Sequence, residues 1–254
     1  MERSIDMISI LCPSRGRPLL AKRMIDTVYN TVSDPKNIEF LLYLNEDDPT
    51  LDDYKKYVDK KHYIVGPNQS TCYSWNQLAE KAKFDILFLA GDDIQFITKN
   101  WDLNIIKVFE MFPDKICMAA PFDGNGKGNG NALLINEEPY QLKENEQVGS
   151  PHFAVHRNWM AALGYFVPPF FWHWYVDTYN QTVAKKLGRC FYLTKTVVKA
   201  KKVLDNTGEQ VRKNLNIALR DDYVWTKIQR HLDTDVTKLK EFIDNYKKIN
   251  SVNS

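Results

Sequence analysis

The chain carries the sequence ILFLAGDDIQF from Ile86 to Phe96. Its first five residues are all apolar, a pattern typical of a strand that is buried on both faces of a parallel sheet. Asp92 and Asp93 follow where such a strand ends, which is the edge at which open α/β sheets bind ligands. Carboxylate oxygens suit hard cations such as Mg²⁺ or Mn²⁺, and these cations commonly accompany phosphates. The alternative is a solvated turn, because Gly and Asp are frequent turn residues.

Strand and helix patterns alternate around this stretch. A loop with two prolines and a glycine, PSRGRP, follows the strand expected at Met7–Cys12, and Leu20, Met24 and Val28 then recur at helical spacing. Further strands are expected at Glu39–Leu44, Tyr63–Val65 and Cys117–Pro121, and further helices at Thr50–Lys60, Tyr73–Ala82 and Trp101–Met111. This alternation predicts an α/β fold with a mostly parallel central sheet flanked by helices.

The second half of the chain has a different character. Residues 123–131 read DGNGKGNGN, which indicates a flexible loop and lacks the strand and helix setting of a phosphate-binding P-loop. Short strands and aromatic clusters follow up to residue 205. The apolar residues of the tail fit one face of an amphipathic helix, namely Val236, Leu239, Phe242, Ile243, Tyr246 and Ile249.

Composition places the 254-residue chain among soluble globular proteins, with 44% hydrophobic and 26% charged residues. No apolar stretch approaches the roughly 20 residues that a membrane-spanning helix needs, and the N-terminus lacks the apolar core of a secretory signal. The four cysteines form no CxxC pair, so no zinc site is indicated. We therefore expect a cytoplasmic protein without a membrane span, whose cysteines are reduced.

The net charge of +2 is unevenly distributed. Residues 185–213 hold nine Lys or Arg residues against two acidic ones, which gives this segment a charge of +7 and leaves −5 for the remainder. A basic patch of this size can face the phosphates of a nucleotide or of nucleic acid, or it can be a solvated surface.

The order of these motifs resembles that of one enzyme family. PSRGRP, NEDDP at residues 45–49, Asn76 near a helix start, LFLAGDDIQF and Trp101-Asp102 are similar to the motifs of glycosyltransferases with the A-type nucleotide-binding fold (GT-A), in particular the family 2-like branch with its small bacteriophage members. The resemblance covers roughly residues 7–205. It implies a Rossmann-like domain over residues 1–205, with a nucleotide-sugar half at about 1–122, an acceptor half at about 123–205, and a helical extension over residues 206–254.

The resemblance assigns the donor site to residues at the ends of the first strands. Arg suits a diphosphate or stacks on a base, and acidic groups bond ribose hydroxyls in other nucleotide sites. A UDP-sugar is the expected donor. The assigned residues are Pro13, Ser14, Arg15, Arg17, Asn45, Glu46, Asp47, Asn76 and Asp92.

The resemblance also implies a divalent cation, Mn²⁺ or Mg²⁺, held by Asp93 together with Asp92. The cation would neutralise the charge that builds on the departing nucleotide. Many relatives complete this metal site with a His in the strand after LGRCFYL, but this chain reads TVVKAKKV there. Lys199, Lys201 or Lys202 would instead supply positive charge to the diphosphate.

On the acceptor side, PHFAVHRNW reads as a strand that leads into a helix and places His152 and His156 on one face. The following motif, LGYFVPPFFWHWYVDTYN, is so aromatic that it must pack or bind something, and both sugar rings and bases stack on aromatic faces. The resemblance implies Asp177 as the general base, with His173 as a competing candidate or an orienting partner. The residues assigned to the acceptor are His152, His156, Trp172 and Trp174.

These features predict a glycosyltransferase that moves a sugar from a nucleotide-sugar to an acceptor hydroxyl, with inversion and with help from a metal. One expected acceptor is a hydroxymethylated base of viral DNA in a host cytoplasm, because the chain is short, has an aromatic loop and carries the +7 segment. The other is a cell-surface or lipid-linked glycan. Two further functions stay open, a nucleotidyltransferase and a non-catalytic nucleotide-sugar-binding module. The former needs a Gly-rich basic loop after the first strand, where PSRGRP has a single Gly.

Overall fold

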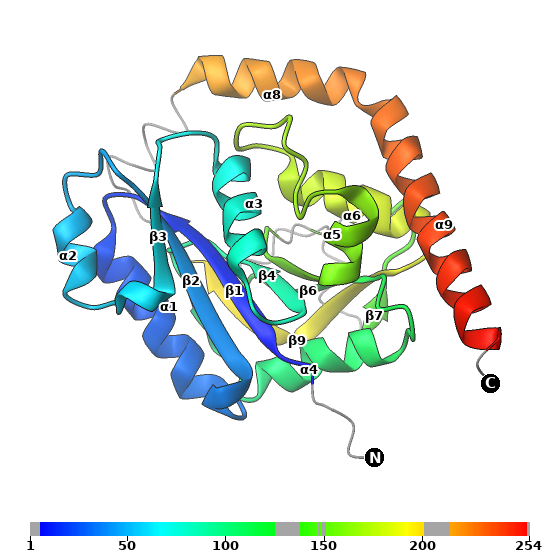
Figure 1. Cartoon of the computed structure of the whole chain (residues 1–254), viewed down its shortest axis with the longest axis horizontal. Coiled ribbons are helices and arrows are strands. Elements are labelled where there is room, and N and C mark those ends of the chain that lie inside the picture. The colour runs from blue at the N-terminus through cyan, green and yellow to red at the C-terminus, as the bar shows by residue number, and fades with distance from the viewer. Residues whose placement is uncertain (1–5, 125–137, 147, 149–150, 201–213, 253–254) are drawn as a thin grey trace.

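The computed structural model describes residues 6–124, 138–146, 148, 151–200 and 214–252. A central sheet runs through this part of the molecule, with helices on both of its faces (Figure 1). Its strands are β1 (Ile8–Ser14), β2 (Ile38–Asn45), β3 (Tyr63–Gly66), β4 (Ile86–Leu89), β5 (Ile94–Phe96), β6 (Met118–Phe122), β7 (Tyr140–Gln141), β8 (Phe153–His156) and β9 (Cys190–Ala200). The helices are α1 (Pro18–Thr31), α2 (Leu51–Lys55), α3 (Thr71–Lys81), α4 (Trp101–Glu110), α5 (Arg157–Leu163), α6 (Val176–Lys186), α8 (Leu215–Lys227) and α9 (Gln229–Val252).

The sheet is mostly parallel. Its strand order is β3-β2-β1-β4-β8-β6-β9-β5, and β7 pairs with β9. β1, β2, β3 and β4 pair in parallel, as do β6 and β9. β8 lies antiparallel between β4 and β6, so these two run in the same direction. The predicted α/β class is therefore confirmed, and the carboxyl ends of the parallel strands share one edge, which we call the carboxyl edge.

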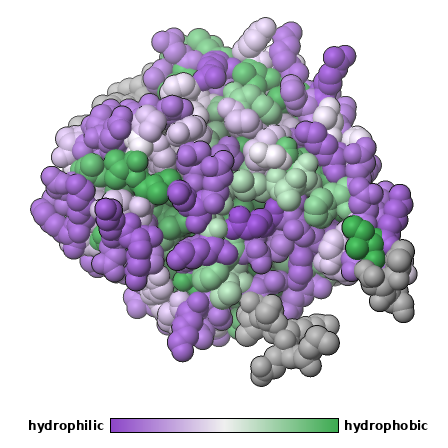
Figure 2. Space-filling view, viewed as in Figure 1, coloured by the Kyte–Doolittle hydropathy of each residue, from purple (hydrophilic) through white to green (hydrophobic). Residues whose placement is uncertain are grey.

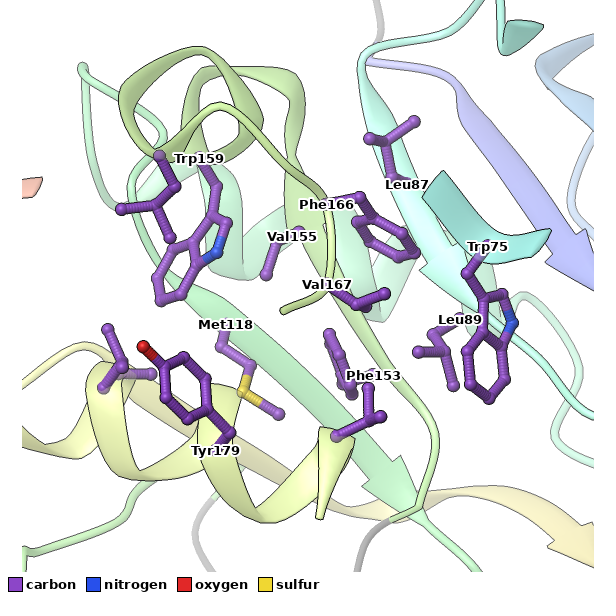
Figure 3. Close-up of a cluster of buried hydrophobic side chains, with 14 of the residues drawn as sticks. Trp75, Leu87, Leu89, Met118, Phe153, Val155, Trp159, Phe166, Val167 and Tyr179 are labelled. Carbon is purple, nitrogen blue, oxygen red and sulfur yellow. The ribbon is translucent and has the colours of Figure 1, made fainter. Parts of the chain in front are cut away.

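Two hydrophobic clusters cover opposite faces of the sheet. Because side chains alternate along a strand, β4 sends Leu87 and Leu89 into one cluster and Ile86 and Phe88 into the other. Residues of α3, α5, α6 and α9 complete the first cluster, and residues of α1, α2 and α4 complete the second. Figure 3 shows part of the first cluster around β4, β6 and β8.

Local signals explain most helix boundaries. α1 begins at Pro18, whose fixed φ suits the first helical turn. The Ser70 hydroxyl caps α3 by accepting a hydrogen bond from the Tyr73 N–H at 3.0 Å. α2 is shorter than the predicted helix over Thr50–Lys60 and ends at Lys55. The chain turns there, and both Tyr54 and Val58 are buried in the core.

The tail forms two helices. α9 packs on α5 and α6, and three of its predicted apolar residues, Val236, Leu239 and Ile243, are buried in the first cluster, whereas Ile249 is exposed. α8 runs across the top of the view in Figure 1. Most of the face in Figure 2 is hydrophilic, with hydrophobic side chains in separate patches. Among the described residues, no helix is long and apolar enough to cross a membrane.

Candidate functional site

The carboxyl edge gathers the loops that the sequence singled out. β1, β2 and β4 are neighbours and parallel, so the loops that follow them lie side by side. Hydrogen bonds join these loops directly. Ser14 donates to the Asp92 carboxylate at 2.7 Å, and Arg17 forms an ion pair with the same group at 3.0 Å. Residues about 75 positions apart in the chain thus meet at one point.

Asp92 is the buried centre of this network. Only 5% of the residue is exposed, and burial raises the pKa of its carboxyl to about 6 although Arg17 and the Ser14 hydroxyl both favour the charged form. The two carboxylate oxygens are occupied, since Oδ2 accepts from Ser14 and Oδ1 from Arg17. Asp92 therefore ties the turn after β4 to the loop after β1.

An exposed ion pair joins the ends of β1 and β2. The Arg15 guanidinium pairs with the Asp47 carboxylate, which also accepts from the Asn68 amide at 3.1 Å. These bonds hold the pKa of Asp47 below its usual value, with the Arg15 hydrogen bond as the main cause. Asn45 is buried and its amide lies 3.4 Å from the Pro67 carbonyl, whereas Glu46 is exposed at the edge. Pro13 lies within β1, where it is opposite Tyr43 of β2.

Three residues of this region were not predicted. The buried Tyr54 hydroxyl accepts from the Arg17 N–H at 2.9 Å and lies 2.7 Å from the Ser14 hydroxyl, to which it donates because the Ser14 proton goes to Asp92. The Asp48 carboxylate accepts from the Gly16 N–H at 2.8 Å, where Gly16 has a positive φ of 67°. Arg23 of α1 donates to the Asp93 carbonyl at 3.3 Å. These partners are distant in sequence, so no local pattern indicates them.

Gly91 lies close against Asp93 and His152. A Cβ atom on Gly91 would lie 3.0 Å from the Asp93 Oδ1 atom and 3.6 Å from the His152 ring, so a side chain at this position would press on the Asp93 carboxylate. His152 is buried, and burial lowers its pKa to about 4. Within the described ranges, no group of three or more His, Cys, Asp and Glu side chains could hold a metal ion. A cation at this turn would therefore need ligands from outside these side chains.

Lys199 lies on β9, where it is opposite Gln95 of β5, the strand that follows the Asp92-Asp93 turn. Its side chain crosses Gly124, whose positive φ and lack of Cβ leave room for the Lys199 stem; a Cβ there would lie 3.1 Å from the Lys199 Cγ atom. Lys199 is thus near the acidic turn. Lys201 and Lys202 lie outside the described residues, as do residues 125–131 of the glycine-rich loop.

The loop before α6 lies beside the start of α3, the helix that follows β3, because the Thr71 N–H donates to the Trp172 carbonyl at 2.9 Å. Burial raises the pKa of the Asp177 carboxyl at the start of α6. The same effect lowers the pKa of His173, whose Nδ1 atom lies 2.9 Å from the Thr71 hydroxyl of α3. Trp172 and Trp174 on either side are 36% and 37% exposed, and Asp221 of α8, which the sequence did not indicate, holds their backbone.

Two assigned residues lie elsewhere. The structure does not place His156 at the carboxyl edge, because β8 is antiparallel to β4 and puts His156 opposite Ile86, where β4 begins. That position is about 10 Å from the carboxyl end of β4 at Leu89, and the His156 ring accepts from the Asn158 N–H to cap α5. His152 and His156 are about 13 Å apart along the extended backbone, and the antiparallel direction of β8 puts His152 at the carboxyl edge and His156 at the opposite end. The Asn76 amide is bonded to the backbone of Phe166 and Val167.

Solved structures of low sequence identity share this architecture. A mannosyltransferase from Pyrobaculum calidifontis in complex with GDP-Man and Mn²⁺ matches with a TM-score of 0.65 and 11% identity, over 93% of this chain and 70% of its own. TarS 1–349 from S. aureus in complex with UDP matches with a TM-score of 0.61 and 14% identity, over 91% of this chain and 69% of its own.

A second TarS structure matches with a TM-score of 0.60 and 14% identity over 81% of this chain, which spans only 38% of that longer protein. No protein-family model and no curated protein sequence matches the chain. The strand order, the acidic turn after β4 and these structural matches agree with one another. The chain has the A-type glycosyltransferase fold.

Proposed function

We propose that the chain transfers a sugar from a nucleotide-sugar donor to an acceptor hydroxyl group. The observation that carries the proposal is the Asp92-Asp93 turn at the carboxyl edge, joined to the loop after β1 through Ser14 and Arg17. Proteins of the same fold that were solved with GDP-Man, UDP-GlcNAc or UDP support a nucleotide-sugar as the donor. A UDP-sugar is the first donor to test.

The donor nucleotide would lie across the loops after β1 and β2. Arg15, Glu46 and Asp47 are accessible there for the base and the ribose. Lys199 supplies positive charge for the diphosphate from β9. The buried Asp92 keeps the turn in place, and Asp93 beside it would face the ligand.

A bound Mn²⁺ or Mg²⁺ would supply charge neutralisation at the leaving diphosphate, and proteins of this fold solved with Mn²⁺ support such an ion. Asp93 would hold it beside Gly91, with Asp92 behind as the fixed anchor. Arg23 steadies the same turn through the Asp93 carbonyl.

Asp177 is proposed as the general base. Its raised pKa makes the carboxylate a better proton acceptor at neutral pH. It takes the proton of the acceptor hydroxyl while that oxygen forms a bond to the anomeric carbon, and the bond from this carbon to the diphosphate breaks with its electron pair leaving on the nucleotide. Attack from the face opposite the leaving group inverts the configuration. His173 lies near the same loop, and burial keeps its ring neutral, which suits an orienting partner.

Trp172 and Trp174 are each more than one third exposed, which suits an acceptor that stacks, and both sugars and bases do so. His152 is proposed to contribute from the neighbouring strand end. A glycan and a hydroxymethylated DNA base are distinguished by salt, because binding to duplex DNA weakens steeply as salt rises. Binding that is insensitive to salt assigns the acceptor to the glycan class.

The test compares the wild type with Asp177→Asn. Both proteins should be stabilised by UDP with Mn²⁺ in a thermal-shift experiment, because ligand binding raises the folded population. Transfer or donor hydrolysis should fall by about 10²- to 10⁴-fold in the variant, the usual contribution of a general base. Equal turnover in both proteins would refute Asp177 as the base. A wild type that binds UDP but turns over no nucleotide-sugar in a broad panel would favour a binding module.

A further inference from the structure

The loop that precedes α6 is held on one side by α3. The Thr71 N–H donates to the Trp172 carbonyl at 2.9 Å, and the Thr71 hydroxyl lies 2.9 Å from the His173 Nδ1 atom. Thr71 is the first residue of α3, so these contacts anchor the loop to a rigid element beside β4. They fix one edge of the loop and the orientation of the His173 ring.

The other side of the loop is held by a single carboxylate of α8. Asp221 is fully buried. Its Oδ1 atom accepts from the Trp172 N–H, and its Oδ2 atom accepts from the N–H groups of His173 and Trp174, each at 2.8 Å. Three successive backbone N–H groups that converge on one anion form a concave binding site for negative charge. Such charge-assisted bonds are among the stronger hydrogen bonds in proteins.

Neighbouring side chains of α8 make further contacts with this loop, up to the start of α6. The Tyr175 ring stacks on the Trp225 ring with centroids 5.0 Å apart, and its hydroxyl donates to Asp222. Tyr175 has a positive φ of 67° and is the residue from which α6 starts, two positions before Asp177. The Arg220 guanidinium lies 5.2 Å from the centre of the Trp172 ring. α8 therefore contacts every residue from Trp172 to Tyr175.

The bonds to Asp221 use only the backbone of the loop. We call these three bonds the clamp. The Trp172 and Trp174 side chains stay more than one third exposed, so the clamp fixes the path of the backbone without enclosing the two rings. Two partly exposed tryptophans in one loop form a small aromatic surface that a ligand can contact. The pattern fits a surface that is held in shape for a ligand.

We propose that Asp221 is a positioning residue for the acceptor side of the site, so that α8 is part of the catalytic apparatus. This inference rests on the proposed sugar transfer. By holding the backbone of residues 172–174, Asp221 sets the two tryptophans against the acceptor and sets the direction in which α6 presents Asp177. Loss of the clamp should therefore reduce the rate of transfer and leave the donor loops after β1, β2 and β4 as they are.

The experiment uses the full chain with Asp221→Asn, and with Asp233→Asn as the matched control. Asn keeps the Oδ1 acceptor but replaces Oδ2 with a donor, so the amides of His173 and Trp174 lose their partner. Asp233 is an exposed carboxylate of α9 that pairs with Lys186. Hydrogen exchange of the peptide covering residues 170–177 reads the clamp directly, because those N–H groups are the ones bound.

For Asp221→Asn we expect exchange in this peptide to rise by about tenfold or more. The kcat for transfer should fall on the order of a hundredfold, the effect of a displacement of about 1 Å at a reacting centre. The Kd for UDP with Mn²⁺ should stay within about twofold of the wild type, since the donor loops are intact. Asp233→Asn should leave all three quantities unchanged.

Faster exchange with an unchanged kcat would overturn the inference, and so would unchanged exchange. If Asp221→Asn does not fold, Tyr175→Phe takes its place. This variant loses only the bond to Asp222, and a smaller change of exchange and kcat in the same direction is expected. No change in either quantity would refute the role of α8 in positioning the loop. A wild type that binds UDP but transfers no sugar instead refutes the proposed function, and the exchange data then report on the clamp alone.

Discussion

Replacement of Arg17 with Met removes the cation that pairs with the buried Asp92 carboxylate while keeping a side chain of similar length. In the wild type the pKa of Asp92 is about 6, above the usual 3.8. The native state therefore binds this proton more tightly than the unfolded state does. The stabilisation from Asp92 is complete below pH 3.8 and is lost as the pH rises through 6. Without Arg17 the pKa of Asp92 rises further.

Protonation of Asp92 limits how far Arg17→Met can lower the free energy of unfolding. Loss of one partner from a buried ion pair commonly costs about 3–5 kcal/mol when the remaining group stays ionised. Asp92 can instead take up a proton and become neutral, which at pH 7 and a pKa of about 6 costs about 1.4 kcal/mol. We therefore expect Arg17→Met to lower the free energy of unfolding by no more than about 1.5 kcal/mol at pH 7. At pH 5 both proteins hold the proton, and the difference should shrink to a few tenths.

Urea unfolding at pH 7 and pH 5, in EDTA and without nucleotide, measures both differences. Arg15→Met is the matched control, because Arg15 pairs with Asp47 on the surface, where the two side chains are 33% and 52% exposed. An exposed pair contributes little to stability, and the pKa of Asp47 lies below its usual value, so this variant should change little between pH 7 and pH 5. A loss of stability for Arg17→Met that is as large at pH 5 as at pH 7 would contradict the assignment of Asp92 as the titrating group.

Three further predictions concern other parts of the molecule. Gly91→Ala should displace the Asp93 carboxylate by a few tenths of an ångström. Calorimetry should then show Mn²⁺-dependent UDP binding weakened by less than about tenfold, and unchanged affinity would argue against a cation beside Gly91. Asp235→Asn removes the charge that accepts from the Tyr165 and Tyr179 hydroxyls and should cost about 1.5–3 kcal/mol in urea unfolding with UDP affinity intact. The kcat of transfer should decline as the pH falls through the raised pKa of Asp177, because the protonated carboxyl cannot accept a proton, and this limb of the profile should be missing in Asp177→Asn.

Much of the parallel sheet follows from local sequence. β1, β2, β3, β4 and β6 lie within two residues of the expected strands. For β1, β2, β4 and β6 the reason is burial on both faces, which favours apolar residues throughout, whereas no residue of β3 is buried. The direction of β8 could not be foreseen, since the alternation in PHFAVH is the same in a parallel and an antiparallel strand. That ambiguity explains why His156 was assigned to the acceptor and lies instead where β4 begins.

The sequence predicted the part of the site that is formed by loops at the ends of strands. The contacts of Ser14 and Arg17 with Asp92 connect loops that the sequence had marked separately. Tyr54 and Asp221 were missed, because each acts through a hydrogen bond to a residue at least 37 positions away. A tyrosine at helical spacing and an aspartate in a polar helix look the same whether or not such a partner exists.

The place of Asp221 in the chain has a consequence for biosynthesis. Trp172 precedes the carboxylate that holds it by 49 residues, and a nascent polypeptide emerges from the ribosome with its amino-terminal part first. Residues 172–174 are therefore synthesised well before the carboxylate that accepts from their backbone. Under the proposed function, the acceptor side would be the last part of the site to be completed during synthesis.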